Sequence, residues 1–361
     1  GRRNRKPPAP TKKRILSLVR EKYPDFGPSF AREKLEEVHD IKVSVETLRK
    51  WMTEVHIWAP HSRKVHRHPL RRRRSCLGEM IQADGSHDFW FEDRGEKCAL
   101  IVFEDDATGK LTSLHFSKGE SLDGYFKALE KHLKRYGRPL SIYTDHFRVF
   151  DSPVEGNLTQ FRRALKTLGI KSILASTPQA KGRVERANRT LQDRLIKEMR
   201  LRKISTIDEA NKFAPEFVEI FNRKFSKEPA SPFNAHRPLG TEVDLERILC
   251  RYDERTLTKD GVFQFHNKFY KITEEVRGID LQGRRVEIRL GKTGAVRAFL
   301  KDTDTELRMV QTNALRGLEI PTEITCEDQR KPRVPWAPSA AHPWKMRLYR
   351  TRTRQLLQKV V

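Results

Sequence analysis

Three carboxylates, Asp84, Asp145 and Glu185, stand where the predicted secondary structure would bring them to one crevice. Asp84 ends a predicted strand over residues 78–84, and Asp145 directly follows another over 140–144. Carboxylates at strand ends face the crevice in which open α/β sheets bind ligands. Carboxylate oxygens are also the ligands that hard divalent cations prefer. This pattern indicates a candidate site for such a cation.

Glu185 lies in the first turn of a long helix predicted from Lys181 or Gly182 to about Arg200, and two interpretations of it stay open. In one, it is a helix N-terminal acid that the macrodipole and local ion pairs favour. In the other, it is a metal ligand on a phosphate-binding surface. The basic and polar residues beside it, which we predict to contact DNA, are Lys181, Arg183, Arg186, Asn188 and Arg189.

A second acidic cluster, Glu104-Asp-Asp106, overlaps the start of the run Asp105-Asp-Ala-Thr-Gly109. Asp side chains commonly bond backbone N–H groups in such turns. A turn between two strands is therefore the favoured interpretation, ahead of a metal site.

The elements that must position the three acids alternate between strand and helix. A mixed α/β sheet is the expected architecture, because antiparallel-compatible strands come first and helices then separate the later strands. The predicted strands are 78–84, 98–103, 111–116, 140–144 and 170–174, and the predicted helices are 122–133, 159–168 and 182–200.

A pair of helices is predicted before this layer, over residues 28–38 and 45–55, with Ser44 able to cap the second. Two helices with a short turn describe a helix-turn-helix, a common arrangement that binds DNA in only some proteins. The DNA contacts predicted on the second helix are Thr47, Arg49 and Lys50.

The charge balance favours a polyanionic partner over a merely basic globular protein. The 361 residues carry 73 Lys and Arg against 48 Asp and Glu, a net charge of +25. Binding a nucleic acid releases counterions for each phosphate that Lys or Arg neutralises. One basic run ends in Arg71, Arg72, Arg73 and Arg74, which we predict to contact DNA. No apolar stretch is long enough to cross a membrane, and the four scattered cysteines fit a reducing cytoplasm.

Short strands punctuated by glycines are predicted after the sheet, from about Leu257 to Leu300. A small SH3-like β-barrel is the expected arrangement. It has two open roles, in DNA binding or assembly and as a stabilising appendage. A basic tail follows it.

Several motifs carry a resemblance to a known family. The core motifs resemble those of DDE transposases, whose catalytic core is retroviral-integrase-like. The full set of motifs resembles the ISNCY-type transposases of bacterial insertion sequences. The resemblance spans about Lys22 to Leu315. It rests on Tyr23-Pro-Asp-Phe-Gly-Pro28, Val45-Glu-Thr-Leu-Arg-Lys-Trp51, Gln82-Ala-Asp84-Gly-Ser86, Phe103-Glu-Asp-Asp-Ala-Thr-Gly109, Ile142-Tyr-Thr-Asp145, Lys181-Gly-Arg-Val-Glu185-Arg-Ala-Asn188-Arg189 and Glu228-Pro-Ala-Ser-Pro232.

The resemblance implies an RNase H-like core with Asp84, Asp145 and Glu185 as catalytic and metal-binding residues. Two Mg²⁺ ions, for which Mn²⁺ would substitute, would be shared so that Asp84 bridges both while the other two acids complete one each. Such a pair stabilises both the attacking and the leaving oxygen of a phosphodiester.

The implied function is a DNA transposase that binds terminal inverted repeats of an insertion sequence, cleaves at the element ends and joins the 3′-hydroxyls to target DNA. The implied partners are double-stranded DNA and further copies of the chain, in a dimer or larger synaptic complex at the bacterial nucleoid in the cytoplasm. A DNA-binding regulator on a retired core and a structure-specific nuclease are the alternatives.

The predicted multidomain α/β organisation has six parts. They are a helix-turn-helix domain (1–60), a basic linker (61–77), the RNase H-like catalytic core (78–226), a second linker (227–249), the small β-barrel (250–315) and the basic tail (316–361).

Overall fold

The computed structural model describes residues 9–60, 72–152, 157–175, 182–273, 281–291, 294–301 and 305–312. Predictions that fall on other residues lie outside the described part of the chain. These are the DNA contacts of Arg71 and Lys181, most of the linker 61–77, and the tail 316–361.

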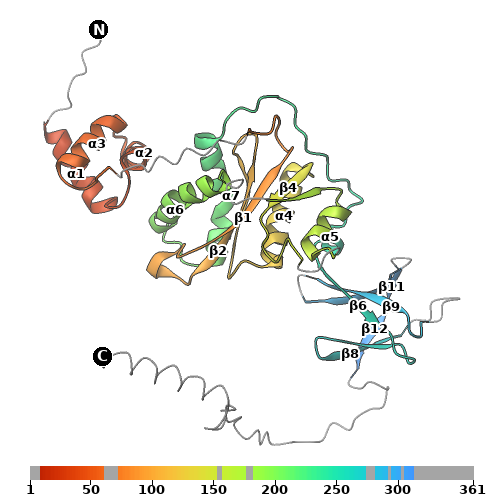
Figure 1. The fold of residues 1–361 in the computed structure, drawn as a ribbon. Helices are drawn as coiled ribbons and strands as arrows, with labels where there is room; N and C mark the ends of the chain where they lie inside the picture. The colour runs from red at the N-terminus through yellow and green to blue at the C-terminus, as the bar shows by residue number, and fades with distance from the viewer. Residues whose placement is uncertain are drawn as a thin grey trace, which may run out of the picture.

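Three helices, α1 (Ala9–Lys22), α2 (Pro28–His39) and α3 (Val45–Glu54), form the N-terminal unit (Figure 1). Their apolar faces meet in one cluster that includes the fully buried Phe30, Leu35 and Leu48. Ser44 caps α3, because its Oγ accepts a 3.0 Å hydrogen bond from the Thr47 N–H group. The helix pair α2–α3 lies where the apolar periodicity predicted it, whereas its use as a DNA-reading helix-turn-helix stays a prediction.

The central sheet has five strands in the order β3-β2-β1-β4-β5. The strands β1 (Ile81–Asp88), β2 (Cys98–Asp105) and β3 (Leu111–Ser117) pair antiparallel, whereas β4 (Ser141–Thr144) and β5 (Lys171–Leu174) add in parallel. The predicted mixed α/β sheet is therefore confirmed.

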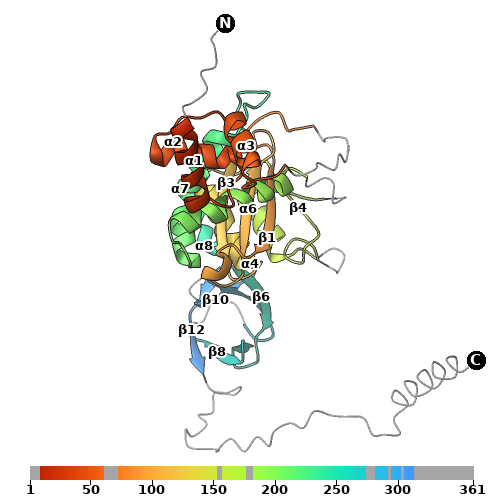
Figure 2. The same ribbon diagram turned by 90° about the vertical axis from the view of Figure 1, so that its left-hand side faces the viewer.

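Helices cover both faces of this sheet (Figures 1 and 2). The helices α4 (Leu122–Tyr136) and α5 (Gln160–Thr167) share one apolar cluster with the sheet, and α6 (Val184–Leu201) and α7 (Ile207–Phe225) share the other. A short 3-10 helix, η1 (Glu92–Arg94), follows β1. No described helix has the length and apolar character needed to cross a membrane.

Asparagines of α7 complete the edge strand β3. Asn211 and Asn222 each exchange two hydrogen bonds with the backbone of β3, at Phe116 and Leu111 respectively. Exposed edges are liable to pair with other chains, and these amides satisfy part of this edge internally.

The N-terminal unit contacts the core through charged side chains of α2. Arg194 of α6 forms a bidentate pair with Glu33, at 2.6 and 3.0 Å, and lies over the Phe30 ring at 4.7 Å. Lys34 pairs with Glu198 at 2.5 Å, with side chains only 7% and 3% exposed. These groups are ion-pair partners in an interface rather than a solvated helix face.

The C-terminal unit begins with the short helix α8 (Leu245–Ile248), which lies inside the predicted linker 227–249 and packs through Leu245 on the α4–α5 side of the core. Seven described strands follow in two sheets, with the orders β11-β10-β9-β6 and β12-β8-β7. They are β6 (Arg251–Thr256), β7 (Val262–Phe265), β8 (Lys268–Ile272), β9 (Arg285–Leu290), β10 (Val296–Leu300), β11 (Thr305–Leu307) and β12 (Met309–Thr312).

The prediction of a closed β-barrel was wrong for the described residues, because their strands pair only within each of these two sheets. A turn at residues 257–261 separates β6 from β7, and the two sheets are held together by apolar side chains. Val286 and Ile288 of one sheet share a core with Phe263 and Tyr270 of the other.

Candidate active site

Asp84 lies inside β1, four residues before its end and not at the strand end that the sequence predicted, whereas Asp145 directly follows the parallel strand β4 as predicted. Ile81 of β1 is paired with Ile142 of β4. The pairing extends to Gln82 and Tyr143, and each acid stands two residues beyond that pair, so the register, if continued, would place them opposite each other. Adjacent strands are about 4.8 Å apart, and both acids are half-buried. Two carboxylates at this separation suit a shared cation.

The first turn of α6 brings a third group to Asp84. Asn188 is 8% exposed, and its Nδ2 donates a 2.8 Å hydrogen bond to Asp84 Oδ2. Glu185 precedes Asn188 by three residues, so both lie on the same side of the helix. Val184, Leu191 and Leu195 pack in the core, as the periodicity predicted, and the buried Asn188 borders their stripe.

The three acids do not form one coordination cluster in this structure. Among the described residues, no group of three or more His, Cys, Asp or Glu side chains is close enough to hold a single ion. Glu185 is exposed, whereas Asp84 and Asp145 are half-buried. The sheet therefore brings two of the three predicted acids together, and α6 holds the third alongside.

The acidic run after β2 is a turn, in agreement with the favoured interpretation. Asp105 Oδ2 accepts hydrogen bonds from the N–H and Oγ1 of Thr108, at 2.8 and 2.7 Å, and Oδ1 accepts one from the Gly78 N–H at 2.9 Å. Burial raises the pKa of the neighbouring Glu104 to about 8. Asp105 therefore has structural partners within the turn.

Asp106, next in this run, ties three segments to the site. Its carboxylate accepts a 2.5 Å hydrogen bond from Gln82 Nε2 on β1 and a 2.8 Å bond from the Arg74 N–H group. It also forms an ion pair with Arg183, which directly precedes α6. This buried acid holds the start of α6, and with it Glu185, against β1.

The predicted DNA contacts that the structure describes fall into three groups. Arg73 and Arg183 bond to the turn just described, and Asn188 bonds to Asp84. Thr47 accepts or donates a 2.8 Å bond with Ser44, and Arg49 pairs with Glu46 on the surface of α3. The others that the structure describes, all exposed to solvent, are Lys50, Arg72, Arg74, Arg186 and Arg189.

Glu120 is a site residue that the sequence did not indicate. Its carboxyl group lies directly over Gly85, the neighbour of Asp84, where a Cβ atom would come within 2.4 Å of its Cδ. Tyr125 donates a hydrogen bond to it, and His87 Nε2 lies 3.5 Å from its Oε2. Burial raises the pKa of Glu120, and the charges of Asp145 and Asp84 act in the same direction. A fourth carboxyl group therefore borders the pair.

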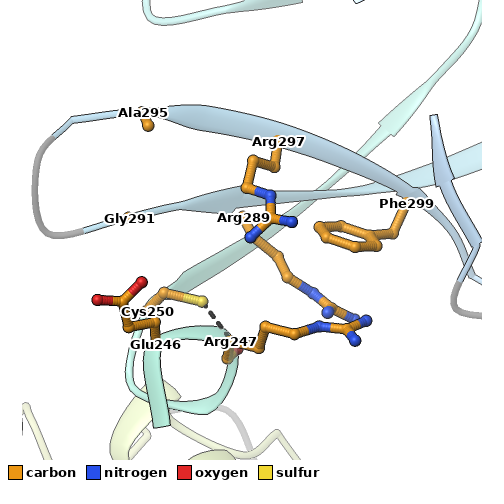
Figure 3. A pocket seen from close by; sticks show the side chains of 8 residues that line it. All are labelled: Glu246, Arg247, Cys250, Arg289, Gly291, Ala295, Arg297 and Phe299. Carbon is orange, nitrogen blue, oxygen red and sulfur yellow. Dashed lines mark hydrogen bonds between the residues drawn. The ribbon is translucent and has the colours of Figure 1, made fainter. Parts of the chain in front are cut away.

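A separate arginine-rich pocket of about 170 Å³ lies between α8, β9 and β10 (Figure 3). Arg247, Arg289 and Arg297 surround the Phe299 ring, at 5.2, 3.9 and 5.5 Å from its centroid. Glu287 pairs with Arg289, and Glu306 with Arg297. Two of the three arginines are therefore paired with acids of the same unit.

Comparison with known proteins finds two curated relatives named as transposases. The chain is 45% identical over 278 residues to the putative transposase y4bF of Sinorhizobium fredii (strain NBRC 101917 / NGR234), covering 75% of this chain and 61% of that protein. It is 32% identical over 397 residues to the transposase for insertion sequence IS1202 of Streptococcus pneumoniae, covering 96% of this chain and 83% of that protein. No family model matches the chain.

Solved structures with low overall similarity include the magnesium complex of the HTLV-2 integrase catalytic core domain, in its trimeric form. It is 23% identical, has a TM-score of 0.31, and covers 38% of this chain and 82% of its own. A simian T-cell lymphotropic virus intasome in complex with PP2A regulatory subunit B56 gamma is 16% identical, with a TM-score of 0.36, and covers 81% of this chain and 99% of its own.

Proposed function

Because this chain belongs to the family of insertion-sequence transposases, we propose that it is a metal-dependent DNA transposase whose catalytic groups are Asp84, Asp145 and Glu185. It binds the terminal inverted repeats of its element, cleaves at the ends and joins the 3′-hydroxyls to target DNA. The observation that carries this proposal is that β1, which holds Asp84, pairs in parallel with β4, which Asp145 directly follows, while Asn188 of α6 bonds to Asp84.

The donor set fits hard divalent cations. Asp84, Asp145 and Glu185 offer only carboxylate oxygens, which suit Mg²⁺ and also Mn²⁺. We propose that the first two hold one ion together and that Asp84 and Glu185 hold a second. Bound cations of this kind supply stabilisation of the charge that develops on the attacking and leaving oxygens of a phosphodiester.

The protein's own groups position the acids and the DNA. The Asn188 amide fixes the orientation of the Asp84 carboxylate, and the Asp106–Arg183 pair holds the first turn of α6 beside it. Arg186 and Arg189 extend from the exposed side of that helix and neutralise DNA phosphates. No Ser or Tyr nucleophile is needed, because water and then the freed 3′-hydroxyl attack.

The architecture supports the finer assignments. The strand order β3-β2-β1-β4-β5, antiparallel and then parallel, favours an RNase H-like catalytic core. The N-terminal three-helix unit binds terminal repeats through Thr47, Arg49 and Lys50 of α3. Two DNA ends must be held at once, so we propose a dimer or larger synaptic complex on the bacterial nucleoid in the cytoplasm. The chain spans 61% of the length of the first relative, so the whole activity is part of the proposal.

A joining assay tests the proposed function. Labelled oligonucleotides that carry candidate element ends are incubated with the protein, plasmid target and Mg²⁺ or Mn²⁺. A transposase yields nicked ends and labelled plasmid. Cleaved ends without joined product would instead identify a nuclease. Specific binding of the ends with no metal-dependent product would identify a DNA-binding regulator.

A further inference from the structure

An open pocket of about 1180 Å³ lies beyond the end of β3, outside the acidic site. The first turns of two long helices, α4 and α7, border it. Helix N-termini carry partial positive charge and favour anions. Four lysines also line the pocket: Lys118, Lys127, Lys131 and Lys212.

Lys131 is the half-buried centre of this cluster. Its Nζ lies 3.1 Å from the Leu114 carbonyl oxygen, 3.3 Å from Asn211 Oδ1 and 3.2 Å from His115 Nδ1. Burial lowers the pKa of Lys131 to about 8, and the charge of Lys127 adds to that effect. Burial, with both lysines, lowers the pKa of His115 to about 4. Among the contacts described, this positive charge is balanced by neutral acceptors alone.

Three carboxylates also line the pocket. They are Glu96, Asp123 and Asp208, the last two in the first turns of α4 and α7. Asp123 pairs with Arg251 at 3.1 Å. The hydroxyl group of Ser205 adds a neutral donor to the lining. The pocket therefore offers cations and hydrogen-bond donors to an oxyanion.

We propose that this lysine pocket binds phosphate groups of the DNA backbone, as a second contact beside the acidic site. The inference rests on the proposed function, in that DNA is the ligand. Strand register relates the two sites, because Asp84 is paired with Val102, which is paired with Leu114, the carbonyl partner of Lys131. Two strand spacings amount to roughly 10 Å between the backbones of Asp84 and Leu114, and Lys131 Nζ lies 3.1 Å beyond the Leu114 carbonyl oxygen. This separation is of the order of the ~12 Å width of a major groove, so one duplex would span both sites.

The test compares two variants of the full chain that lose equal charge. The pocket variant replaces the three exposed lysines of the lining: Lys118→Gln, Lys127→Gln and Lys212→Gln. The control replaces three exposed lysines outside it: Lys134→Gln, Lys166→Gln and Lys171→Gln. Affinity for a duplex of fixed sequence is measured from 50 to 300 mM salt, together with oligomeric state and thermal unfolding.

Each phosphate contact contributes about 0.9 to the slope of log affinity against log salt. The slope is expected to be shallower by about 1–3 for the pocket variant, while the control keeps the wild-type slope. Equal slopes and affinities for the two variants would overturn the pocket proposal. A changed subunit number with an unchanged slope would overturn it as well, in favour of a contact between copies.

A labelling experiment with inorganic phosphate provides a second measurement, which uses the wild-type protein and so does not depend on whether a variant folds. At pH 8, amine-reactive labelling of Lys131 is expected to fall several-fold when either the duplex or millimolar phosphate is present. Protection by phosphate but not by DNA would refute the DNA assignment. The two proposals can fail independently. Wild-type protein that joins no DNA ends would refute the proposed function, yet the pocket and control variants could still differ in salt slope.

Discussion

Replacing Asn188 with alanine tests how the helix α6 prepares the acidic site. The amide is 8% exposed and its Nδ2 lies 2.8 Å from Asp84 Oδ2. A hydrogen bond to a charged group contributes about 1.5–3 kcal/mol. At about 1.4 kcal/mol per factor of ten, the loss of this bond corresponds to a decrease of roughly 10- to 150-fold in metal-dependent joining. The buried Oδ1 of Asn188 has no hydrogen-bond partner among the described residues, so the truncation acts mainly on Asp84.

The assay is the initial rate of DNA joining as a function of Mg²⁺ concentration. For Asn188→Ala we expect a higher half-saturating Mg²⁺ concentration and a lower rate, because an unoriented Asp84 must be ordered when the metal binds. Thr190→Ala is the matched control, since Thr190 lies on the same helix and donates only to the Arg186 carbonyl oxygen. A rate and metal dependence within twofold of wild type for Asn188→Ala would refute this reasoning.

Three other changes test the surroundings of the site. Glu120→Gln keeps an acceptor for Tyr125 but removes a carboxyl group beside the acid pair, so it should raise the half-saturating Mg²⁺ concentration several-fold; an unchanged value would exclude an electrostatic role. Burial lowers the pKa of His132 to about 3. Because of this group, the free energy of unfolding falls by about 1.4 kcal/mol for each pH unit below 6.5. Urea unfolding at pH 7 and pH 5 should therefore show a smaller loss of stability for His132→Phe than for wild type. Arg194→Met breaks the bidentate pair with Glu33 and should cost about 2–3 kcal/mol in urea unfolding, so a change below about 0.5 kcal/mol would contradict a docked N-terminal unit.

The sequence predicted the central layer well because local patterns specify it. Apolar periodicity placed α2, α3, α4 and α6 close to their observed ends, and Ser44 marked the start of α3. The mixed character of the sheet followed from strands that come first and helices that separate the later ones, whereas the strand order was not predicted. The closed C-terminal barrel was wrong for the described residues, because closure depends on pairing between strands far apart in sequence, which glycine spacing does not encode.

The acidic site was predictable in part. Asp145 directly follows β4 as the sequence indicated, whereas Asp84 lies inside β1 rather than at its end, because pairing with β2 continues the strand to Asp88. Glu120 was missed because it lies in the loop before α4, and only the tertiary fold brings it to β1. One signal was present in Gly85, since a glycine inside a strand often marks a close approach by another group, and here that group is the Glu120 carboxyl.

The contact between the N-terminal unit and the core could not be derived from the sequence. Glu33, Lys34 and Glu37 of α2 have the pattern of a solvated helix face, yet Arg194, Glu198 and Lys224 pair with them. Charged surfaces look alike in sequence whether their partners are water or another element. Only the arrangement of α2 against α6 and α7 separates the two cases.

The most direct test of the central claim is the metal-dependent joining activity of three conservative variants, Asp84→Asn, Asp145→Asn and Glu185→Gln. Each removes one negative charge while keeping the size of the side chain. The account predicts that every variant loses DNA joining by at least 1000-fold, as expected when a metal-held transition state loses several kcal/mol of stabilisation, while its affinity for element ends stays within a few-fold of wild type. Joining at the wild-type rate by all three variants would contradict it.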